Sequence, residues 1–438
     1  MRNELYHTVI DAGTSKVCTL IGRSSEDQEI QIIGMSSIPS RGMQKGLVSN
    51  LSEVKQVVQN SLKEAESQAG TKATPAYVGI TGSRVNYVNS RAAMDNRDYD
   101  EPVCAKDVEQ VIKASYSSKS TNVDRVLHVI PRDYSVDGHW GIHDPIGMKA
   151  SSVEVESHVV MTDPTSADNL TEAMRIAGVK INTLVLHPLA SAESVLSEDE
   201  KNMGVVMVDI GGGTTDVAIF INGSIWHINV IPVGGAQITR DISIAFTTFA
   251  LAAEEAKLKH GDVSSNEFED SEFIRLPGFG NKIFTDVGKN DLRQIIKERV
   301  RELLSLVLRE VHDAGLDRAP SGGLVLTGGT ANLPGLQELA SEIWPGTVRI
   351  GIPEYPSWVP EELEDPAYAS SLGLLYWGAK HQRENLSNSS INKIINTNLL
   401  GTIFCTKAII PALINSKSVI VLIILKKFIF YFTGSKSK

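Results

Sequence analysis

The first residues whose types and spacing could do chemistry form the run Asp11-Ala12-Gly13-Thr14-Ser15-Lys16. A tight turn that combines glycine with hydroxyl side chains offers backbone N–H and O–H groups to phosphate oxygens. Lys16 adds a positive charge, and Asp11 can hold Mg²⁺ through water. Similar turns also occur in hairpins that bind nothing, so this run alone leaves a purely structural interpretation open.

A second run with the same pattern, Asp209-Ile210-Gly211-Gly212-Gly213-Thr214-Thr215-Asp216, follows about 200 residues later. Three consecutive glycines after an apolar strand are costly unless the backbone must approach something closely. A hairpin that needs only positive φ angles uses one or two glycines. The run therefore predicts a second turn that admits a phosphate.

A third glycine turn lies at 326–333, where Gly328, Gly329 and Thr330 follow an apolar strand. We expect the strand to pass through this turn into a helix, whose first N–H groups would face a ribose or an α-phosphate. Glu254 and Lys257 lie three residues apart on the predicted helix AEEAKLKHG and share one face. They are either a ribose-binding pair or a solvated ion pair.

The segments around these turns are predicted to form the two halves of a repeated structure. In each half, an apolar strand ends in Asp, a glycine turn follows, and a second strand returns as a hairpin partner. The sequences of the halves are not visibly alike, so the pattern predicts a duplication of structure. The predicted strands are Tyr6–Asp11, Val17–Gly22, Gly204–Asp209 and Val217–Ile221, and the predicted helices include a segment capped by Asn50 or Ser52 and ended by Gly70, Asp163–Ala177, Ala236–Ala245, Ala252–Lys259, Asn290–Ala314 and Leu333–Ile343.

Residues 83–161 have a different pattern of polar and apolar residues, because short alternating runs flank one predicted helix near Lys106–Ser117. This pattern predicts a small α+β module inserted into the first domain. Beyond Gln382 the composition shifts to Asn and Ser, which predicts a linker.

Composition excludes several classes of protein. The 438 residues are 42% hydrophobic and 21% charged, as in ordinary folded proteins. The three cysteines are far apart and have no metal-like spacing, so neither a disulfide framework nor a zinc site fits. The start, Met1–Tyr6, is polar and does not resemble a signal peptide.

The net charge of −10 is unevenly distributed. From 386 to 438 there are seven Lys and no Asp, Glu or Arg, so residues 1–385 carry −17. An acidic body without a basic stripe argues against nucleic acid as a partner.

The same tail is strongly apolar between Val419 and Phe432, where twelve of fourteen residues are apolar and Lys426 and Lys427 interrupt the run. The run is too short to span a bilayer, which takes about 20 apolar residues. Apolar bulk with Lys and aromatic residues suits an anchor in the membrane interface. A buried strand and an aggregation-prone end without a role remain open.

The order and spacing of the three turns resemble the actin-like ATPase superfamily. Within it, the chain is similar to the bacterial cell-division family FtsA over about residues 5–380. The stretches that carry the resemblance are VIDAGTSKVCTLIG (9–22), IPSRGMQKGLVSN (38–50), YVGITGSRV (77–85), DYDEPV (98–103), LHVIPRDYSVDGHWGIHDPIGM (127–148), VDIGGGTTDVAIF (208–220), IPVGGAQITRDI (231–242), AEEAKLKHG (253–261) and TGGTANLPGL (327–336). The tail from 385 onward departs from the family pattern.

The resemblance implies an α/β actin-like, ribonuclease H-like fold of two domains that hold ATP in the cleft between them, with an inserted α+β subdomain. The expected first domain (1A) comprises 1–82, 162–201 and 350–383, with the insertion (1C) at 83–161. The expected second domain comprises 202–230 with 300–349 (2A) and 231–299 (2B). Residues 384–438 would be the linker and the basic apolar tail.

The resemblance also implies roles for single residues. Phosphate contacts would come from Gly13, Thr14, Ser15, Lys16, Gly211, Gly212, Gly213, Thr214 and Thr215, and the ribose and adenine would meet Glu254, Lys257, Gly328, Gly329 and Thr330. Asp11 and Asp209 would approach Mg²⁺ through water. His187 stands where relatives in the superfamily often have Glu or Gln to orient the attacking water. A neutral imidazole can do this and an imidazolium cannot accept the proton, so at most a slow ATPase is expected.

The partners that the resemblance implies are the tubulin-like FtsZ ring, further copies of the chain in filaments, other division proteins, and inner-membrane lipid through the tail. The protein would then sit at the septum, peripheral to the cytoplasmic face of the membrane. Two alternatives remain at this point: the pilus-assembly relative PilM, with the same ATP core, and a phosphotransferase of the sugar-kinase type.

Overall fold

The computed structural model describes residues 4–25, 28–82, 85–95, 100–117, 124–264, 272–278, 284–316, 318–353 and 360–394. Its first five-stranded sheet has the order β3-β2-β1-β6-β11. The strands are β1 (Leu5–Ala12), β2 (Lys16–Ser25), β3 (Gln28–Pro39), β6 (Ala76–Ile80) and β11 (Ile181–Leu186). β1, β2 and β3 are antiparallel, whereas β6 pairs in parallel with β1 and β11.

The second five-stranded sheet repeats this arrangement with the order β14-β13-β12-β17-β18. Its strands are β12 (Val205–Ile210), β13 (Thr215–Ile221), β14 (Ser224–Ile231), β17 (Leu324–Thr327) and β18 (Val348–Ile350). Again three strands are antiparallel and two follow in parallel. The duplication predicted from the two glycine turns is confirmed by this shared topology.

Strand alternation gives the first sheet two buried faces. Ile10 and Val17 face one side, where α1 (Leu51–Ala69) packs with α3 (Pro164–Ile176). Val9 and Leu20 face the other side and meet α10 (Ala369–Ile394). As predicted, Asn50 caps α1 by accepting from the backbone N–H groups of its first turn, and Gly70 ends it in the left-handed conformation.

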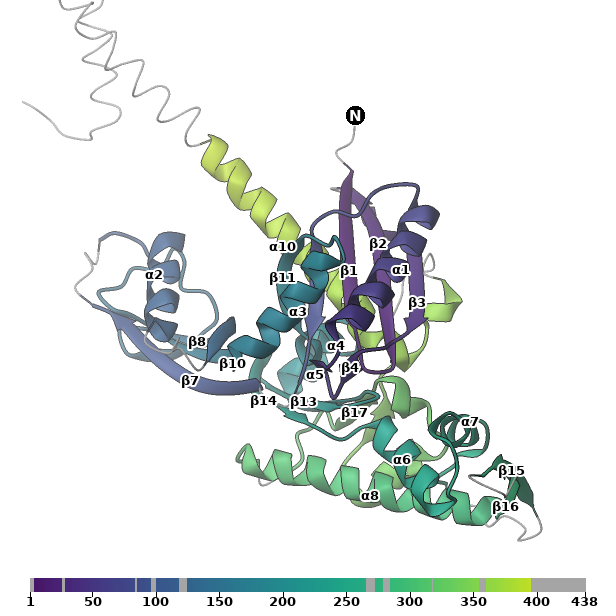
Figure 1. Cartoon of the computed structure of the whole chain (residues 1–438). Helices are drawn as coiled ribbons and strands as arrows, with labels where there is room; N and C mark the ends of the chain where they lie inside the picture. The colour runs from purple at the N-terminus through teal and green to yellow at the C-terminus, as the bar shows by residue number, and fades with distance from the viewer. Residues whose placement is uncertain are drawn as a thin grey trace, which may run out of the picture. The chain divides into compact units, whose positions relative to one another are not determined.

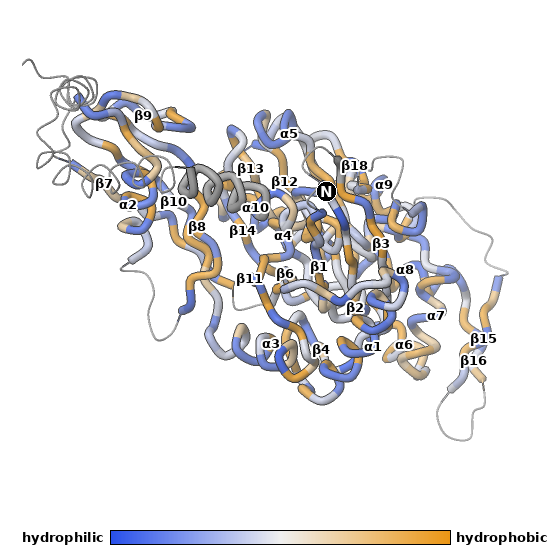
Figure 2. The backbone as a smooth tube through the Cα atoms, turned by 90° about the horizontal axis from the view of Figure 1, so that it is seen from above, coloured by the Kyte–Doolittle hydropathy of each residue, from blue (hydrophilic) through white to orange (hydrophobic). Residues whose placement is uncertain are grey.

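The second sheet is covered in the same manner. Val206 and Val208 of β12 pack in one cluster with α8 (Lys289–Asp313), while Val205 and Met207 face the cluster that contains α4 (His187–Val195). α6 (Gly235–Ala245) and α7 (Ala250–His260) pack on α8, as Figure 1 shows. Figure 2 shows the hydrophobic residues gathered along the central strands, including β12 and β13.

Residues between β6 and α3 form a separate small sheet of order β7-β10-β8-β9, with α2 (Ala105–Tyr116) packed on it. Its strands are β7 (Val85–Met94), β8 (Arg125–Val136), β9 (His139–Ile142) and β10 (Val153–Thr162). It has its own small core around Val111, Val153 and Val155. The predicted inserted α+β subdomain is therefore present.

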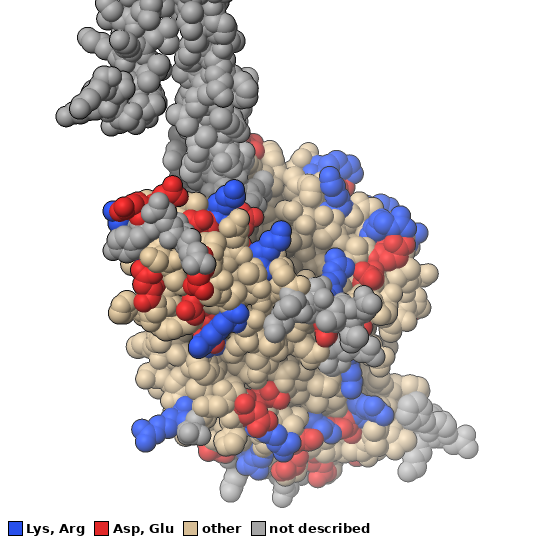
Figure 3. Space-filling model, turned by 90° about the vertical axis from the view of Figure 1, so that its left-hand side faces the viewer, with Lys and Arg blue, Asp and Glu red and all other residues tan. Residues whose placement is uncertain are grey.

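The remaining elements are short. They are β4 (Met43–Gln44), β5 (Leu47–Val48), α5 (Glu198–Met203), β15 (Phe273–Pro277), β16 (Phe284–Gly288), α9 (Leu336–Ile343) and the 3₁₀ turns η1 (Gly329–Asn332), η2 (Glu361–Leu363) and η3 (Pro366–Tyr368). On the face drawn in Figure 3, basic and acidic side chains are interspersed.

Two predictions about local structure differ from the observed fold. The third glycine turn leads into the 3₁₀ turn η1, and the α-helix begins only at Leu336, because Pro334 and a left-handed Gly335 interrupt the run. The linker predicted beyond Gln382 is helical as far as Ile394 in α10. The predicted membrane anchor at 419–432 lies outside the described residues. Among the helices that are described, none has the length and hydropathy needed to cross a bilayer.

Candidate functional site

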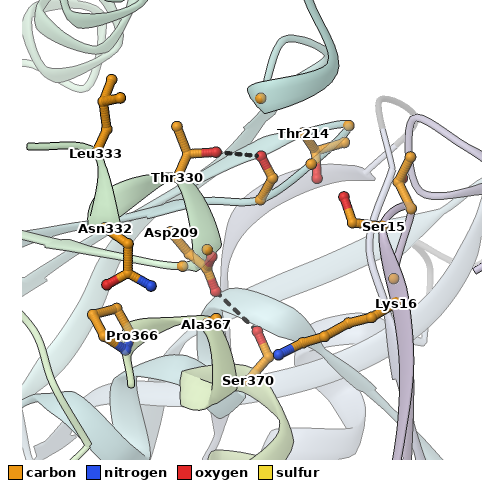
Figure 4. A pocket seen from close by; sticks show the side chains of 18 of the residues that line it. Ser15, Lys16, Asp209, Thr214, Thr330, Asn332, Leu333, Pro366, Ala367 and Ser370 are labelled. Carbon is orange, nitrogen blue, oxygen red and sulfur yellow. Dashed lines mark hydrogen bonds between the residues drawn. The ribbon is translucent and has the colours of Figure 1, made fainter. Parts of the chain in front are cut away.

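The three glycine turns meet around one cavity of about 380 Å³. It lies at the carboxyl ends of β1 and β12, where sheets of this type usually hold their ligands. The cavity is lined by nearly all of the residues selected from the sequence: Asp11, Gly13, Thr14, Ser15, Lys16, His187, Asp209, Gly211, Gly212, Gly213, Thr214, Glu254, Lys257, Gly328, Gly329 and Thr330. Figure 4 shows several of these side chains converging from different elements.

The first two turns have the same geometry. β1 and β2 pair up to Ala12 and Val17, and the N–H of Gly13 donates to the carbonyl of Lys16 at 2.9 Å. β12 and β13 pair up to Ile210 and Thr215, and the N–H of Gly211 donates to the carbonyl of Thr214 at 2.9 Å. The two turns therefore have the same backbone hydrogen bonding, and they face each other at the cavity.

Contact between these turns explains the second and third glycines of the run. A Cβ atom at Gly212 would lie 1.8 Å from Oγ of Ser15, and one at Gly213 would lie 2.5 Å from Oγ1 of Thr14. Neither glycine has a positive φ. The second turn therefore needs glycine because the first turn lies against it.

The backbone groups at the tips of both turns are available to a ligand. Within the described part of the chain, the amide N–H groups of Thr14, Ser15, Gly212 and Gly213 donate to no other atom. Successive N–H groups directed into a concavity bind anions. A polyphosphate fits this chemistry, with Lys16 as an additional charge.

Asp11 is buried and pairs with His187, whose Nε2 lies 3.2 Å from Oδ1 of Asp11. This contact is an ion pair, and Nε2 of His187 has no hydrogen-bond partner among the described residues. Burial alone would lower the pKa of His187, but the charge of Asp11 outweighs it and raises the pKa to about 9. Burial acts to raise the pKa of Asp11, yet His187, Ser371 and Lys16 together lower it.

His187 is therefore an imidazolium at neutral pH. In that state it cannot accept the proton of an attacking water, and the imidazole titration expected near neutrality moves to about pH 9. Gly79 makes room for the ring, because a Cβ there would lie 2.3 Å from Nε2 of His187. In the structure, His187 is the electrostatic partner of Asp11.

Two further carboxylates lie beside this pair. Asp209 accepts a hydrogen bond from Oγ of Ser191 at 2.6 Å, and burial raises its pKa. Asp216 accepts from Oγ1 of Thr81 at 2.9 Å, and burial together with the charge of Asp209 raises its pKa to about 7. The charge of Asp11 acts to raise the pKa of Asp209, and neighbouring carboxylates of this kind can hold a divalent cation through its water shell. Among the described residues, no group of three or more His, Cys, Asp or Glu could hold a metal ion directly.

The other end of the cavity is built by the third turn and α7. Thr330 donates through Oγ1 to the carbonyl of Gly211 at 3.2 Å, which ties the third turn to the second. Lys257 pairs with Glu254 at 2.8 Å and donates to the carbonyl of Gly235 at 3.2 Å. Glu254 and Lys257 thus form an ion pair, and both side chains line the cavity.

Thr215 is the one predicted site residue that does not reach the cavity. It lies on β13 with its side chain on the opposite face from Thr214 and Asp216, and its hydroxyl donates to the carbonyl of Val233 at 2.8 Å. Strand alternation was the signal that separates Thr215 from Asp216. Other lining residues were not selected from the sequence as site residues: Thr81, Gly235, Ile238, Leu258, Asn332, Pro334, Pro366, Ala367 and Ser370.

Comparison with known families gives two matches in different parts of the chain. A model described as cell division protein FtsA matches residues 206–373, and a model for the SHS2 domain inserted in FtsA matches residues 82–161. The second match coincides with the inserted subdomain described above.

Similar full-length relatives are cell division proteins FtsA. The protein from Pseudomonas aeruginosa is 36% identical over 380 residues, covering 87% of this chain and 91% of its own length. That from Escherichia coli K12 is 34% identical over 376 residues, covering 84% and 89%.

Solved structures with a similar fold are more distant. A chain of a PilM–PilN type IV pilus biogenesis complex aligns with a TM-score of 0.58 at 17% identity, covering 86% of this chain and 99% of its own. MreB5 of Spiroplasma citri bound to ADP aligns with a TM-score of 0.52 at 13% identity, covering 87% and 98%. These likenesses show the actin-like fold.

Proposed function

This chain belongs to the FtsA family of cell-division proteins, and on that premise we propose that it binds ATP with Mg²⁺ in the cavity of the three glycine turns. It is an actin-like protein of the division machinery. In this proposal it polymerises, recruits the FtsZ ring and attaches that ring to the cytoplasmic face of the membrane at the septum.

The observation that carries ATP binding is the pair of facing turns. Four free amide groups, two from each turn, border the same space as Lys16. Opposed donors of this kind can hold the β- and γ-phosphates from two sides. Asp11 and Asp209 lie next to them and can hold Mg²⁺ through its water shell. MreB5, which shares the fold, was solved with ADP bound.

The adenosine end of the nucleotide would lie against the third turn and α7. Ile238 and Leu258 supply apolar surface there, and Glu254 and Lys257 supply polar groups for the ribose. With His187 protonated, the site has no neutral imidazole to orient water, so hydrolysis is slow and binding is the main event.

Calorimetric titration of the full chain tests the binding proposal. ATP with Mg²⁺ should bind with 1:1 stoichiometry, and removal of Mg²⁺ by EDTA should weaken the binding. If neither ATP nor ADP gave a heat of binding, the proposal that this chain binds a nucleotide would be refuted.

A separate experiment tests attachment and assembly. The full chain and a chain ended after Ile394 are sedimented with vesicles that contain anionic lipid, with and without ATP. Only the full chain should pellet with vesicles, since the basic apolar tail is the proposed anchor. Electron microscopy of the same samples should show filaments on the lipid, because actin-like folds associate head to tail in contacts that do not close into rings. Equal pelleting of both chains would contradict the anchor.

This chain is 36% identical in sequence to the FtsA protein of Pseudomonas aeruginosa over 380 residues, but 17% identical to the chain of the pilus complex. The higher identity favours a role in division over a role in pilus assembly.

A further inference from the structure

The segment that opens α10 contacts the charged residues of both phosphate turns. Nζ of Lys16 lies 3.2 Å above the centroid of the Tyr368 ring. Oγ of Ser370 donates to Oδ2 of Asp209 at 2.9 Å, and Oγ of Ser371 donates to Oδ2 of Asp11 at 2.8 Å. Within four residues, the end of η3 and the start of α10 thus meet the cation and both carboxylates of the proposed ATP–Mg²⁺ site.

The segment is held firmly before the helix begins. Asp365 accepts from the N–H of Ala367 at 2.7 Å and from the side-chain amide of Asn332 at 2.7 Å. The carbonyl of Pro366 accepts from the N–H of Gly328 at 3.1 Å. These bonds join the 3₁₀ turn η3 to the third glycine turn, so Tyr368 is placed by the same scaffold as the cavity.

Packing fixes the rotation of α10 about its axis. Leu372 and Leu375 lie in the core against β1 and β2. A Cβ at Gly373 would lie 1.7 Å from the carbonyl oxygen of Ala190, so the helix lies directly against the backbone of α4. With these faces buried, the helix cannot turn Ser370 and Ser371 away from the two carboxylates without breaking the core.

Tyr368 does not line the cavity, whereas Lys16 does. Lys16 and Ser370 extend into the same region of the site in Figure 4. An ammonium over an aromatic face is stabilised by the ring quadrupole, and the contact strengthens when water is excluded. A lysine without such support would adopt many rotamers and would have to be ordered again when phosphate binds.

We propose that Tyr368, Ser370 and Ser371 are positioning residues of the nucleotide site: the tyrosine ring holds the Lys16 ammonium for the phosphates, and the two serines orient Asp209 and Asp11 for the hydrated cation. The inference rests on the proposed ATP binding and deepens it. It assigns the end of η3 and the start of α10 to the site, although all three of their contacts are with groups more than 160 residues away on other elements.

The tyrosine is tested by comparing Tyr368→Leu with Tyr368→Phe in titrations of the full chain with ATP and with adenosine. Tyr368→Leu removes the ring and should weaken ATP binding about 3- to 10-fold, the scale of a partly desolvated cation–π contact. Adenosine, which lacks phosphates, should bind both variants within about 2-fold of the parent. Tyr368→Phe keeps the ring and should restore ATP affinity.

A double change separates this role from a general loss of structure. In a Lys16→Gln background there is no ammonium to position, so adding Tyr368→Leu should leave ATP affinity unchanged. An equal loss in both backgrounds, or a parallel loss of ATP and adenosine affinity, would show that Tyr368 is only structural. Tighter ATP binding by Tyr368→Leu would also overturn the proposal.

The serines are tested by the ratio of ATP affinity with Mg²⁺ to that with EDTA. Ser370→Ala with Ser371→Ala should reduce this ratio several-fold, because the carboxylates lose a hydrogen bond each. Ser194→Ala is the matched control: this buried hydroxyl of α4 donates to the carbonyls of Ala369 at 2.7 Å and Ser191 at 3.0 Å, and among the described residues it bonds to no carboxylate. An unchanged ratio in the double variant, or an equal drop in the control, would refute the assignment. If the parent itself fails to bind ATP, the proposed function fails instead.

Discussion

Nε2 of His187 lies 3.2 Å from Oδ1 of Asp11, and both side chains are buried at the floor of the cleft. The pair places a positive charge beside Asp11, and the charges of Asp216 and Asp209 also act to raise the pKa of His187. Its consequence is that the cleft contains a charged histidine at physiological pH.

His187 should therefore titrate near pH 9 in Mg²⁺-free buffer. A pKa raised in the folded state stabilises the fold fully below about pH 6.5, and this stabilisation is lost as pH rises through about 9. His187→Gln should thus cost most stability below pH 6.5, on the order of 1–3 kcal/mol, and least above pH 9.5. NMR of histidine-labelled protein, with His187→Gln to assign the signal, measures the midpoint. A midpoint between pH 6 and 7 would mean that the ion pair does not form.

Gly212 should tolerate no side chain. Gly212→Ala would place a Cβ 1.8 Å from Oγ of Ser15 and push the two phosphate turns apart. We expect at least a 10-fold loss of ATP affinity and about 1–3 kcal/mol lower stability from overpacking. Gly329→Ala is the control for stability in the absence of nucleotide, because its Cβ would meet only Ala367 at an ordinary 3.6 Å. Calorimetry on the two variants should separate them; similar effects would contradict the contact between the turns.

His158 should make stability depend on pH through the inserted subdomain. It is buried, its Nδ1 is 2.8 Å from Oδ1 of Asn89, and its ring stacks on Tyr87. Burial, with smaller effects of Arg132 and His227, lowers its pKa to about 3.

A lowered histidine pKa stabilises the fold above pH 6.5, and this stabilisation is lost as pH falls from 6.5 toward 3. Between pH 6.5 and 5 the loss is roughly 2 kcal/mol. His158→Gln should remove that dependence, so urea unfolding at pH 7.5 and 5.0 should show a smaller change in the variant than in the parent. His139→Gln, at an exposed position of the same subdomain, should keep the parent's dependence. Identical pH profiles for His158→Gln and the parent would disprove the assignment.

The tail, which lies outside the described residues, should bind membranes mainly through its apolar residues. Each Lys near an anionic surface contributes about 1 kcal/mol at most, and salt screens this contribution. Apolar burial at about 25 cal/mol per Å² contributes more. Leu422→Asp with Ile424→Asp should release the protein from vesicles, whereas Lys426→Ala with Lys427→Ala should weaken binding modestly, and more so at low salt. The reverse order in a sedimentation assay would make the anchor electrostatic.

The two phosphate turns could be predicted from sequence because their signal is local. Asp11 and Asp209 each end an apolar strand, and the glycine and hydroxyl residues that follow define a turn within a few residues. The duplication followed from the same pattern, and the sheets confirm it in strand order. The side chain of Thr215 points away from the cavity and donates to Val233, as the alternation along β13 indicates.

Tertiary structure decided the contacts that join distant parts of the chain. Nothing near Ser371 indicates that it bonds to Asp11, 360 residues away, and nothing near Tyr368 indicates that it holds Lys16. The charge of His187 also depends on burial beside Asp11, which only the packed cleft provides. Local sequence encodes backbone geometry and the face that a side chain occupies, whereas burial, charge state and partners arise when separate elements pack together.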